Sequence, residues 1–182
     1  MPALEESKRD PHASGVVVWF TGLPASGKTT LAMRVRDALA SGNRLSLVLD
    51  GDEVRRSFVP KLGYTEAARA GFYATLGKLA ALIAEQGFVV LVPATAQRRA
   101  WREWARSVAP RFIEVHVTAS ADECARRDQK GLYAAAHAGV LSGLPGVDAD
   151  YEQPTEPTLT CAGGLDEGAV DRVLSAVAAG NA

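Results

Sequence analysis

The sequence has few cysteines, almost no net charge and no long apolar run, and each of these absences excludes a class of protein. Its two cysteines, Cys124 and Cys161, cannot form a disulfide framework, and neither lies in a Cys/His cluster with zinc-site spacing. The formal net charge of −1 shows no basic bias, which argues against a dedicated nucleic-acid binder. The longest apolar runs, at 16–20 and 88–92, are too short to span a bilayer. We therefore expect a cytoplasmic protein that binds neither nucleic acid nor a membrane.

What remains is the composition of an ordinary globular protein. Hydrophobic residues make up 47% of the 182 residues and charged residues 23%, which excludes collagen-like and disordered chains. A chain of this length usually forms one domain. Residues 1–14 are polar and lack the apolar stretch of a signal peptide, so we expect an N-terminal extension there and a single domain over 15–182.

Strand-like and helix-like segments alternate along this domain. Short β-branched or aromatic runs are expected to form strands, at 15–20, 45–49, 88–92, 112–117 and 158–161. Segments with helical spacing or rich in alanine and leucine are expected to form helices, at 27–41, 65–86, 97–108, 119–127, 131–139 and 165–178. This alternation predicts an α/β fold, a parallel sheet of about five strands with helices on both faces. In such sheets, ligands bind beyond the carboxyl ends of the strands.

A complete phosphate-loop motif follows the first expected strand. Residues 22–29 read Gly-Leu-Pro-Ala-Ser-Gly-Lys-Thr and match GxxxxGK[ST] between a strand and a helix, the context that the motif requires. The glycines let backbone N–H groups point inward around an anion, and the helix adds the positive end of its dipole. Lys28 supplies charge to the β- and γ-phosphates, and the Thr29 hydroxyl is placed to ligate Mg²⁺. The motif predicts a P-loop NTPase fold whose nucleoside triphosphate is bound by Gly22, Leu23, Pro24, Ala25, Ser26, Gly27, Lys28, Thr29 and Thr30.

An acidic turn follows the second expected strand. Asp50 and Asp52 stand there, and Arg55 comes three residues later. A carboxylate at the strand ends faces the phosphate loop, where it can accept a proton from an attacking hydroxyl or hold a magnesium-bound water. Arg55 can bind an anionic group through its planar guanidinium. The alternative is that the two carboxylates cap a short helix and have no chemical role.

The combined motifs resemble those of the adenylylsulfate (APS) kinase family, over most of the chain. The resemblance rests on the phosphate loop, on Leu49-Asp-Gly-Asp52 with Arg55, on Leu62-Gly-Tyr-Thr65 with Arg69, on Arg127-Asp-Gln-Lys-Gly-Leu-Tyr133 and on Gly146-Val-Asp-Ala-Asp-Tyr-Glu152. The Arg-Asp-x-Lys-Gly-Leu-Tyr stretch is the most specific of these segments. The resemblance implies a kinase that uses ATP and Mg²⁺ to phosphorylate the ribose 3′-hydroxyl of APS. It also implies small-molecule nucleotide substrates and a possible homodimer.

The family resemblance also implies roles for individual residues. Lys28, Asp50 and Asp52 are the expected catalytic residues, and Thr29 and Asp52 the expected metal ligands. The expected acceptor site contains Arg55, Tyr64, Arg69, Phe72, Lys130 and Leu144. Arg127 is expected to join the ATP site, and residues 128–151 are expected to form a mobile lid over both substrates.

The acceptor side departs from the family pattern at two of these positions. Phe72 stands where an acceptor-binding asparagine is expected, and Leu144 where a second aromatic side chain would close on the adenine. Two alternatives to an APS kinase therefore remain. One is a related kinase that acts on another small hydroxylated acceptor, and the other is an inactive nucleotide-binding homologue.

Arginines gather on the segment expected to form a helix at 97–108. Arg98, Arg99, Arg102 and Arg106 could bind phosphate or sulfate. A run of charge on a helix more often forms a solvated face, and we expect that here except at Arg99, where the resembled family also has an arginine. His116 alternates with apolar residues in an expected strand, which predicts a structural histidine rather than a catalytic one.

Overall fold

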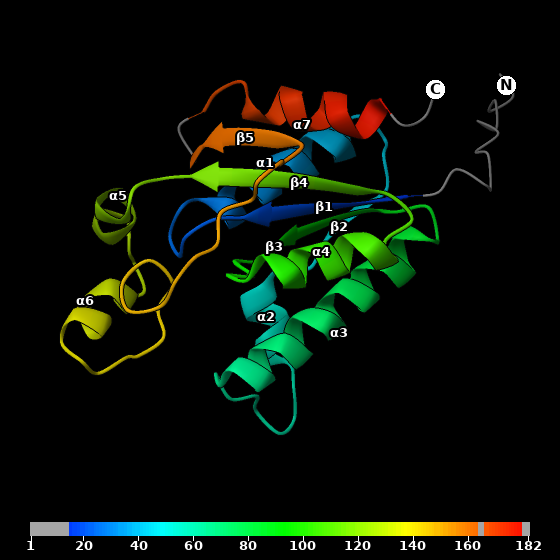
Figure 1. Ribbon diagram of the computed structural model, residues 1–182. Helices are drawn as coiled ribbons and strands as arrows, with labels where there is room; N and C mark the ends of the chain where they lie inside the picture. Colours follow the sequence, from blue (N-terminus) through cyan, green and yellow to red (C-terminus); the bar gives the residue numbers. More distant parts are fainter. Residues whose placement is uncertain (1–14, 164–165, 180–182) are drawn as a thin grey trace, which may run out of the picture.

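A five-stranded parallel sheet is the centre of the computed structural model, which describes residues 15–163 and 166–179 (Figure 1). The strands are β1 (Val16–Thr21), β2 (Ser46–Val48), β3 (Val89–Pro93), β4 (Phe112–Thr118) and β5 (Leu159–Ala162). They lie in the order β2-β3-β1-β4-β5, and every pairing is parallel. All six residues of β1 are buried, as expected for a central strand covered on both faces.

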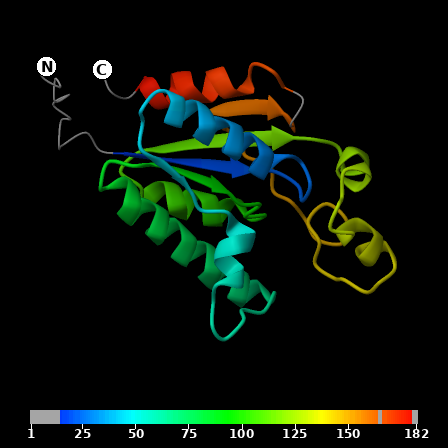
Figure 2. The same cartoon turned by 180° about the vertical axis from the view of Figure 1, so that it is seen from behind.

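Seven helices are described, and four of them cover the two faces of the sheet. The helices are α1 (Lys28–Ser41), α2 (Gly51–Arg56), α3 (Glu66–Ala84), α4 (Arg99–Val108), α5 (Ala121–Arg126), α6 (Leu132–His137) and α7 (Ala169–Ala178). Helices α1 and α7 lie on one face and α3 and α4 on the other, and the opposite view shows the same two layers (Figures 1 and 2). Each layer has its own buried core, because successive side chains of a strand point to opposite faces.

The connections from the carboxyl ends of the strands bring the predicted site residues to one edge of the sheet. The phosphate loop follows β1, the acidic turn follows β2, and α5 and α6 follow β4 at the same edge (Figure 1). The strand order runs outward in both directions from β1, which makes this edge the expected ligand-binding edge of an open parallel sheet.

These observations confirm the predicted α/β fold with helices on both faces. The expected extension at 1–14 lies outside the described residues. Within the described part of the chain, no helix is both long and apolar enough to cross a membrane.

One expectation about α4 is wrong, because its arginines do not form a uniformly solvated face. The Arg102 side chain is 1% exposed and donates from Nε to Glu114 Oε1 at 2.8 Å. It also donates to the carbonyl oxygens of Ala96 at 2.5 Å and Glu152 at 2.7 Å. Arg106 reaches the other oxygen of Glu114 at 2.8 Å. Arg102 is therefore a buried structural cation that joins α4, β4 and the segment at Glu152.

Candidate active site

The phosphate loop connects β1 to α1 through backbone angles that few residues adopt. Gly22 has φ 152°, Ala25 φ 60° and Gly27 φ 99°. A Cβ on Gly22 would lie 2.3 Å from the carbonyl oxygen of Val117, so only glycine fits there. Gly27 precedes the first residue of α1, and the free N–H groups of that helix end therefore border the loop. The loop thus has the backbone geometry that the motif predicts, and anion binding by it stays a prediction.

Lys28 lies inside this loop and is almost fully buried. Its ammonium donates hydrogen bonds to the carbonyl oxygens of Gly22 at 3.1 Å and Leu23 at 2.7 Å. Burial lowers the pKa of Lys28 from 10.5 to about 8, and the carboxylates of Asp52 and Asp50 oppose that shift. The lysine is therefore held beside the loop by neutral partners, which a phosphate group could replace.

Asp50 acts both as a helix cap and as a partner of the phosphate-loop threonine. One of its carboxylate oxygens accepts hydrogen bonds from the backbone N–H groups of Asp52 at 2.9 Å and Glu53 at 3.3 Å, at the start of α2. The other accepts the Thr29 hydroxyl proton at 2.7 Å. The capping interpretation of this residue is therefore correct, and it does not exclude a place in the site.

Asp52 is exposed and its charged partner comes from the segment before α6. The Lys130 ammonium donates to its carboxylate at 2.6 Å, across 78 positions of sequence. This hydrogen bond raises the pKa of Lys130. The two side chains are 66% and 61% exposed, so a ligand entering the site can reach and separate them.

The Arg-Asp-x-Lys-Gly-Leu-Tyr segment has a clear local geometry. Asp128 accepts hydrogen bonds from the backbone N–H groups of Tyr133 at 2.7 Å and Lys130 at 3.2 Å. Gly131 between them has φ 68°, in the left-handed region that favours glycine. Asp128 thereby fixes the start of α6, and the turn directs Lys130 toward Asp52.

A second group of predicted residues lies on α2 and at the start of α3. The Arg55 guanidinium carbon lies 4.0 Å from the Phe72 ring centroid and 4.9 Å from that of Tyr64. Arg69 donates to the carbonyl oxygens of Tyr64 at 3.0 Å and Gly143 at 2.9 Å. Tyr64 is 65% exposed. The structure thus brings two arginines and two aromatic rings together beside the acidic turn.

The two positions that depart from the family pattern are buried. Phe72 is 3% exposed and packs edge-on against Phe58 and Tyr73. Leu144 is 6% exposed and belongs to a separate cluster with Cys124 and Tyr133. The structure does not bring Leu144 into the arginine–aromatic group, although Arg69 binds the preceding carbonyl group. The acceptor-binding roles of both residues stay predictions.

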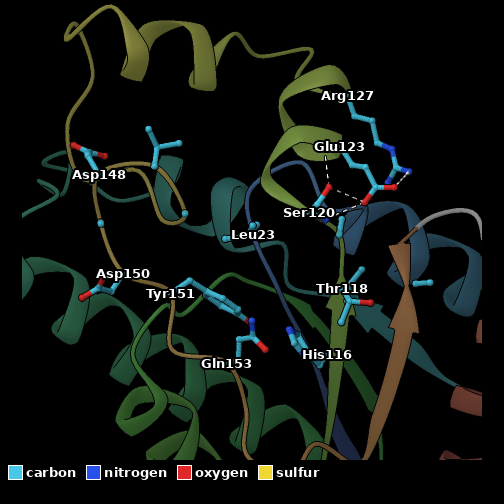
Figure 3. Close-up of a pocket in the computed structure, with 16 residues that line it drawn as sticks. Leu23, His116, Thr118, Ser120, Glu123, Arg127, Asp148, Asp150, Tyr151 and Gln153 are labelled. Atoms are coloured by element: carbon cyan, nitrogen blue, oxygen red, sulfur yellow. Dashed lines mark hydrogen bonds and ion pairs between the residues drawn. The ribbon is translucent and has the colours of Figure 1, made fainter.

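Arg127 lies beside a cavity of about 870 Å³ between the end of β4 and residues 146–153 (Figure 3), and its place in the ATP site stays a prediction. Its guanidinium pairs with Glu123 at 3.8 Å and approaches Gly163. His116 and Tyr151 lie at the opposite side of this cavity (Figure 3). Burial lowers the pKa of His116, which keeps the ring neutral near pH 7. The alternating strand pattern predicted a structural rather than a catalytic His116 and gave no sign of the cavity.

Three features of this site together define a P-loop kinase. They are a phosphate loop at a helix start, an acidic turn after a neighbouring strand and a lysine that reaches that turn. The sequence model of the family described as adenylylsulphate kinase matches residues 14–162. The chain therefore belongs to the adenylylsulphate kinase family.

Individual relatives agree with this family. An adenylyl-sulfate kinase of Picosynechococcus is 40% identical over 154 residues, which cover 84% of this chain and 86% of that protein. The bifunctional enzyme NodQ of Azospirillum brasilense is 46% identical over 79% of this chain, and the match spans 23% of NodQ. The Mycobacterium tuberculosis APS kinase CysC, solved in complex with AMPPNP and APS, superposes with a TM-score of 0.83 at 35% identity. That superposition covers 93% of this chain and 99% of CysC.

Proposed function

We propose that this chain transfers the γ-phosphoryl group of ATP to the ribose 3′-hydroxyl of APS. The observation that carries the proposal is the continuous line of groups from Lys28 and Thr29 through Asp50 and Asp52 to Lys130. The arginine–aromatic group of Arg55, Tyr64, Arg69 and Phe72 adjoins this line through α2 and supplies two cations beside an exposed ring. Family membership and the CysC complex with AMPPNP and APS support the same substrates.

The donor side of this proposal places ATP in the phosphate loop with Mg²⁺. The Thr29 hydroxyl donates its proton to Asp50, so its oxygen lone pairs remain available to a metal ion. Within the described residues no group of three or more His, Cys, Asp or Glu side chains could hold a metal. This sparse oxygen set fits Mg²⁺, which keeps several waters and takes phosphate oxygens as ligands. When bound, Mg²⁺ would neutralise charge on the transferred group, with Thr29 and Asp52 as its protein ligands.

The acceptor side begins with the release of Lys130 from Asp52. An incoming phosphosulfate group offers Lys130 a second anion, and Arg55 and Arg69 add two more cations for it. Asp52 is then free to act on the 3′-hydroxyl and the metal, while Asp50 stays fixed as the cap of α2. Tyr64 is placed to stack on the acceptor adenine. Closure of residues 128–151 would exclude water from the transfer.

ADP release with and without APS tests this proposal. We expect the purified chain to release ADP from MgATP at a rate that depends on APS, and Lys28→Ala to lower that rate on the order of 10²-fold or more. If ADP release requires another hydroxyl compound and never responds to APS, the acceptor assignment is wrong and the kinase class stands. If ATP binds but no acceptor is phosphorylated, the inactive homologue is the correct alternative. The homodimer belongs to the same proposal, and light scattering measures it directly.

A further inference from the structure

A small hydrophobic cluster joins the phosphate loop to the lid. Cys124, Tyr133 and Leu144 form its buried centre, and Leu23 and Ala25 of the phosphate loop pack against them. Residue 146 lies so close to this loop that a Cβ there would be 2.6 Å from a Leu23 methyl carbon. The phosphate loop is therefore packed against residues that come about 100 or more positions later in the chain.

The Tyr133 hydroxyl makes the one direct polar contact described between α6 and the phosphate loop. It donates a hydrogen bond to the Pro24 carbonyl oxygen at 3.0 Å, and the residue is only 3% exposed. Burial, reinforced by the neighbouring Cys124, raises the pKa of Tyr133, so the hydroxyl remains a donor at physiological pH. Asp128 accepts a hydrogen bond from the Tyr133 backbone N–H at 2.7 Å and so fixes the position of the Tyr133 backbone.

The Pro24 carbonyl group matters because of the residue that follows it. The peptide unit is planar and trans, so the Pro24 C=O and the Ala25 N–H point in opposite directions. A bond that holds the carbonyl toward α6 therefore turns the Ala25 N–H away from α6. Ala25 has φ 60°, in the left-handed region that costs energy for any residue with a Cβ. The orientation of this peptide is thus strained, and the Tyr133 hydroxyl opposes its rotation.

We propose that Tyr133 is a positioning residue, which orients the Pro24–Ala25 peptide of the phosphate loop for the donor's β-phosphate. It touches no substrate and acts through the loop. The same contact makes the geometry of the loop depend on the position of the lid, since Tyr133 moves with α6. The inference rests on the donor half of the proposed function, and it holds for any acceptor.

The test removes the Tyr133 hydroxyl and measures the affinity of the variant for two nucleotides, ADP and AMP. ADP carries the β-phosphate that the loop encloses, and AMP lacks it. We expect Tyr133→Phe to weaken ADP binding about 3- to 10-fold, the range for one neutral hydrogen bond, and to leave AMP binding unchanged. Titration calorimetry gives both dissociation constants. Tyr73→Phe is the matched control, because it removes the hydroxyl of a tyrosine that is also buried, 7% exposed on the core-facing side of α3. We expect that control to keep the wild-type ratio of ADP to AMP affinity.

The ratio of the two affinities decides the outcome, because a residue with only a structural role does not change it. Unchanged ADP affinity in Tyr133→Phe overturns the proposal, and so does an equal loss for ADP and AMP. A changed ratio together with no activity toward APS leaves Tyr133 as a positioning residue and overturns only the acceptor assignment. Thermal melting of each variant checks that the fold is intact before the ratio is compared.

Discussion

At the residue scale, burial inside the phosphate loop lowers the pKa of Lys28. Its pKa of about 8 lies close to physiological pH, whereas an exposed lysine stays charged far above it. ATP binding needs the charged form, so affinity is complete well below pH 8 and falls as the pH rises through that value. We expect the affinity for an ATP analogue to drop by up to about tenfold per pH unit above 8. Calorimetric titrations at several pH values measure this decline.

Lys28→Arg is the matched control for this pH dependence. A guanidinium stays charged over the whole range, so the slope above pH 8 should disappear even if the overall affinity falls. Lys130 does not titrate in the same interval, because its bond to Asp52 raises its pKa. A wild-type affinity that is flat between pH 7 and 9.5 would show that the loop leaves the Lys28 ammonium unperturbed.

Single residues also show how far a sequence predicts a site. The backbone geometry of the phosphate loop could be predicted, because the motif that sets it lies in eight consecutive residues, 22–29. The Tyr133–Pro24 bond joins residues 109 positions apart, and no local pattern indicates it. Arg102 resembles its neighbours on the same helix, and its burial depends on partners from other elements, Glu114 on β4 and the carbonyl groups of Ala96 and Glu152.

At the scale of elements, the segment 128–151 is attached firmly at its far end. The Tyr151 hydroxyl lies 2.9 Å from Thr21 Oγ1 at the end of β1, and the Glu152 carboxylate accepts the Arg99 N–H at 2.7 Å, at the start of α4. Nearer the middle, Arg69 binds the Gly143 carbonyl group. Movement of the proposed lid is therefore restricted at 143 and from 151 onward. We expect it to open at α6, where opening must break the Tyr133–Pro24 bond and the Lys130–Asp52 pair.

This arrangement gives a prediction for hydrogen exchange. Amides of α6 should exchange more slowly when an ATP analogue and APS are both bound, because Lys130 and α6 then close over the ligands. Amides of β1 should exchange slowly in both states, since that strand is buried throughout. Mass spectrometry of peptides covering 128–142 and 15–21 measures both. Equal protection of α6 with and without ligands would mean that the segment is a rigid part of the fold.

Elements were easier to predict than the contacts between them. The valine-rich run of β1 and the alanine-rich run of α3 predicted their own conformations, because periodicity and propensity act within one segment. The short helix α2 had only the capping alternative to indicate it, since six residues hold too little periodicity. Burial of Phe72 and Leu144 depended on which faces of α3 and of residues 128–151 pack against other elements. No local sequence pattern predicts these contacts.

At the scale of the whole molecule, the buried ion pair of Arg102 and Glu114 connects three parts of the chain. Arg102→Leu would leave the Glu114 carboxylate with one partly exposed partner and the carbonyl groups of Ala96 and Glu152 without this donor. We expect a loss of about 3–5 kcal/mol in the free energy of unfolding. Urea denaturation measures it. Arg36→Leu, at an exposed pair with Asp37, should cost less than about 1 kcal/mol. Equal losses at the two sites would contradict a stabilising role for the buried network.

The central position of β1 has a consequence for how the chain is made. Residues 16–21 are synthesised before the rest of the sheet, yet both of their partners come much later, at 89–93 and 112–116. Until the ribosome has translated those strands, a run of six apolar-rich residues has no neighbour to pair with and is open to wrong association. The interval between the synthesis of β1 and that of β4 is therefore the period in which this apolar segment lacks its native partners.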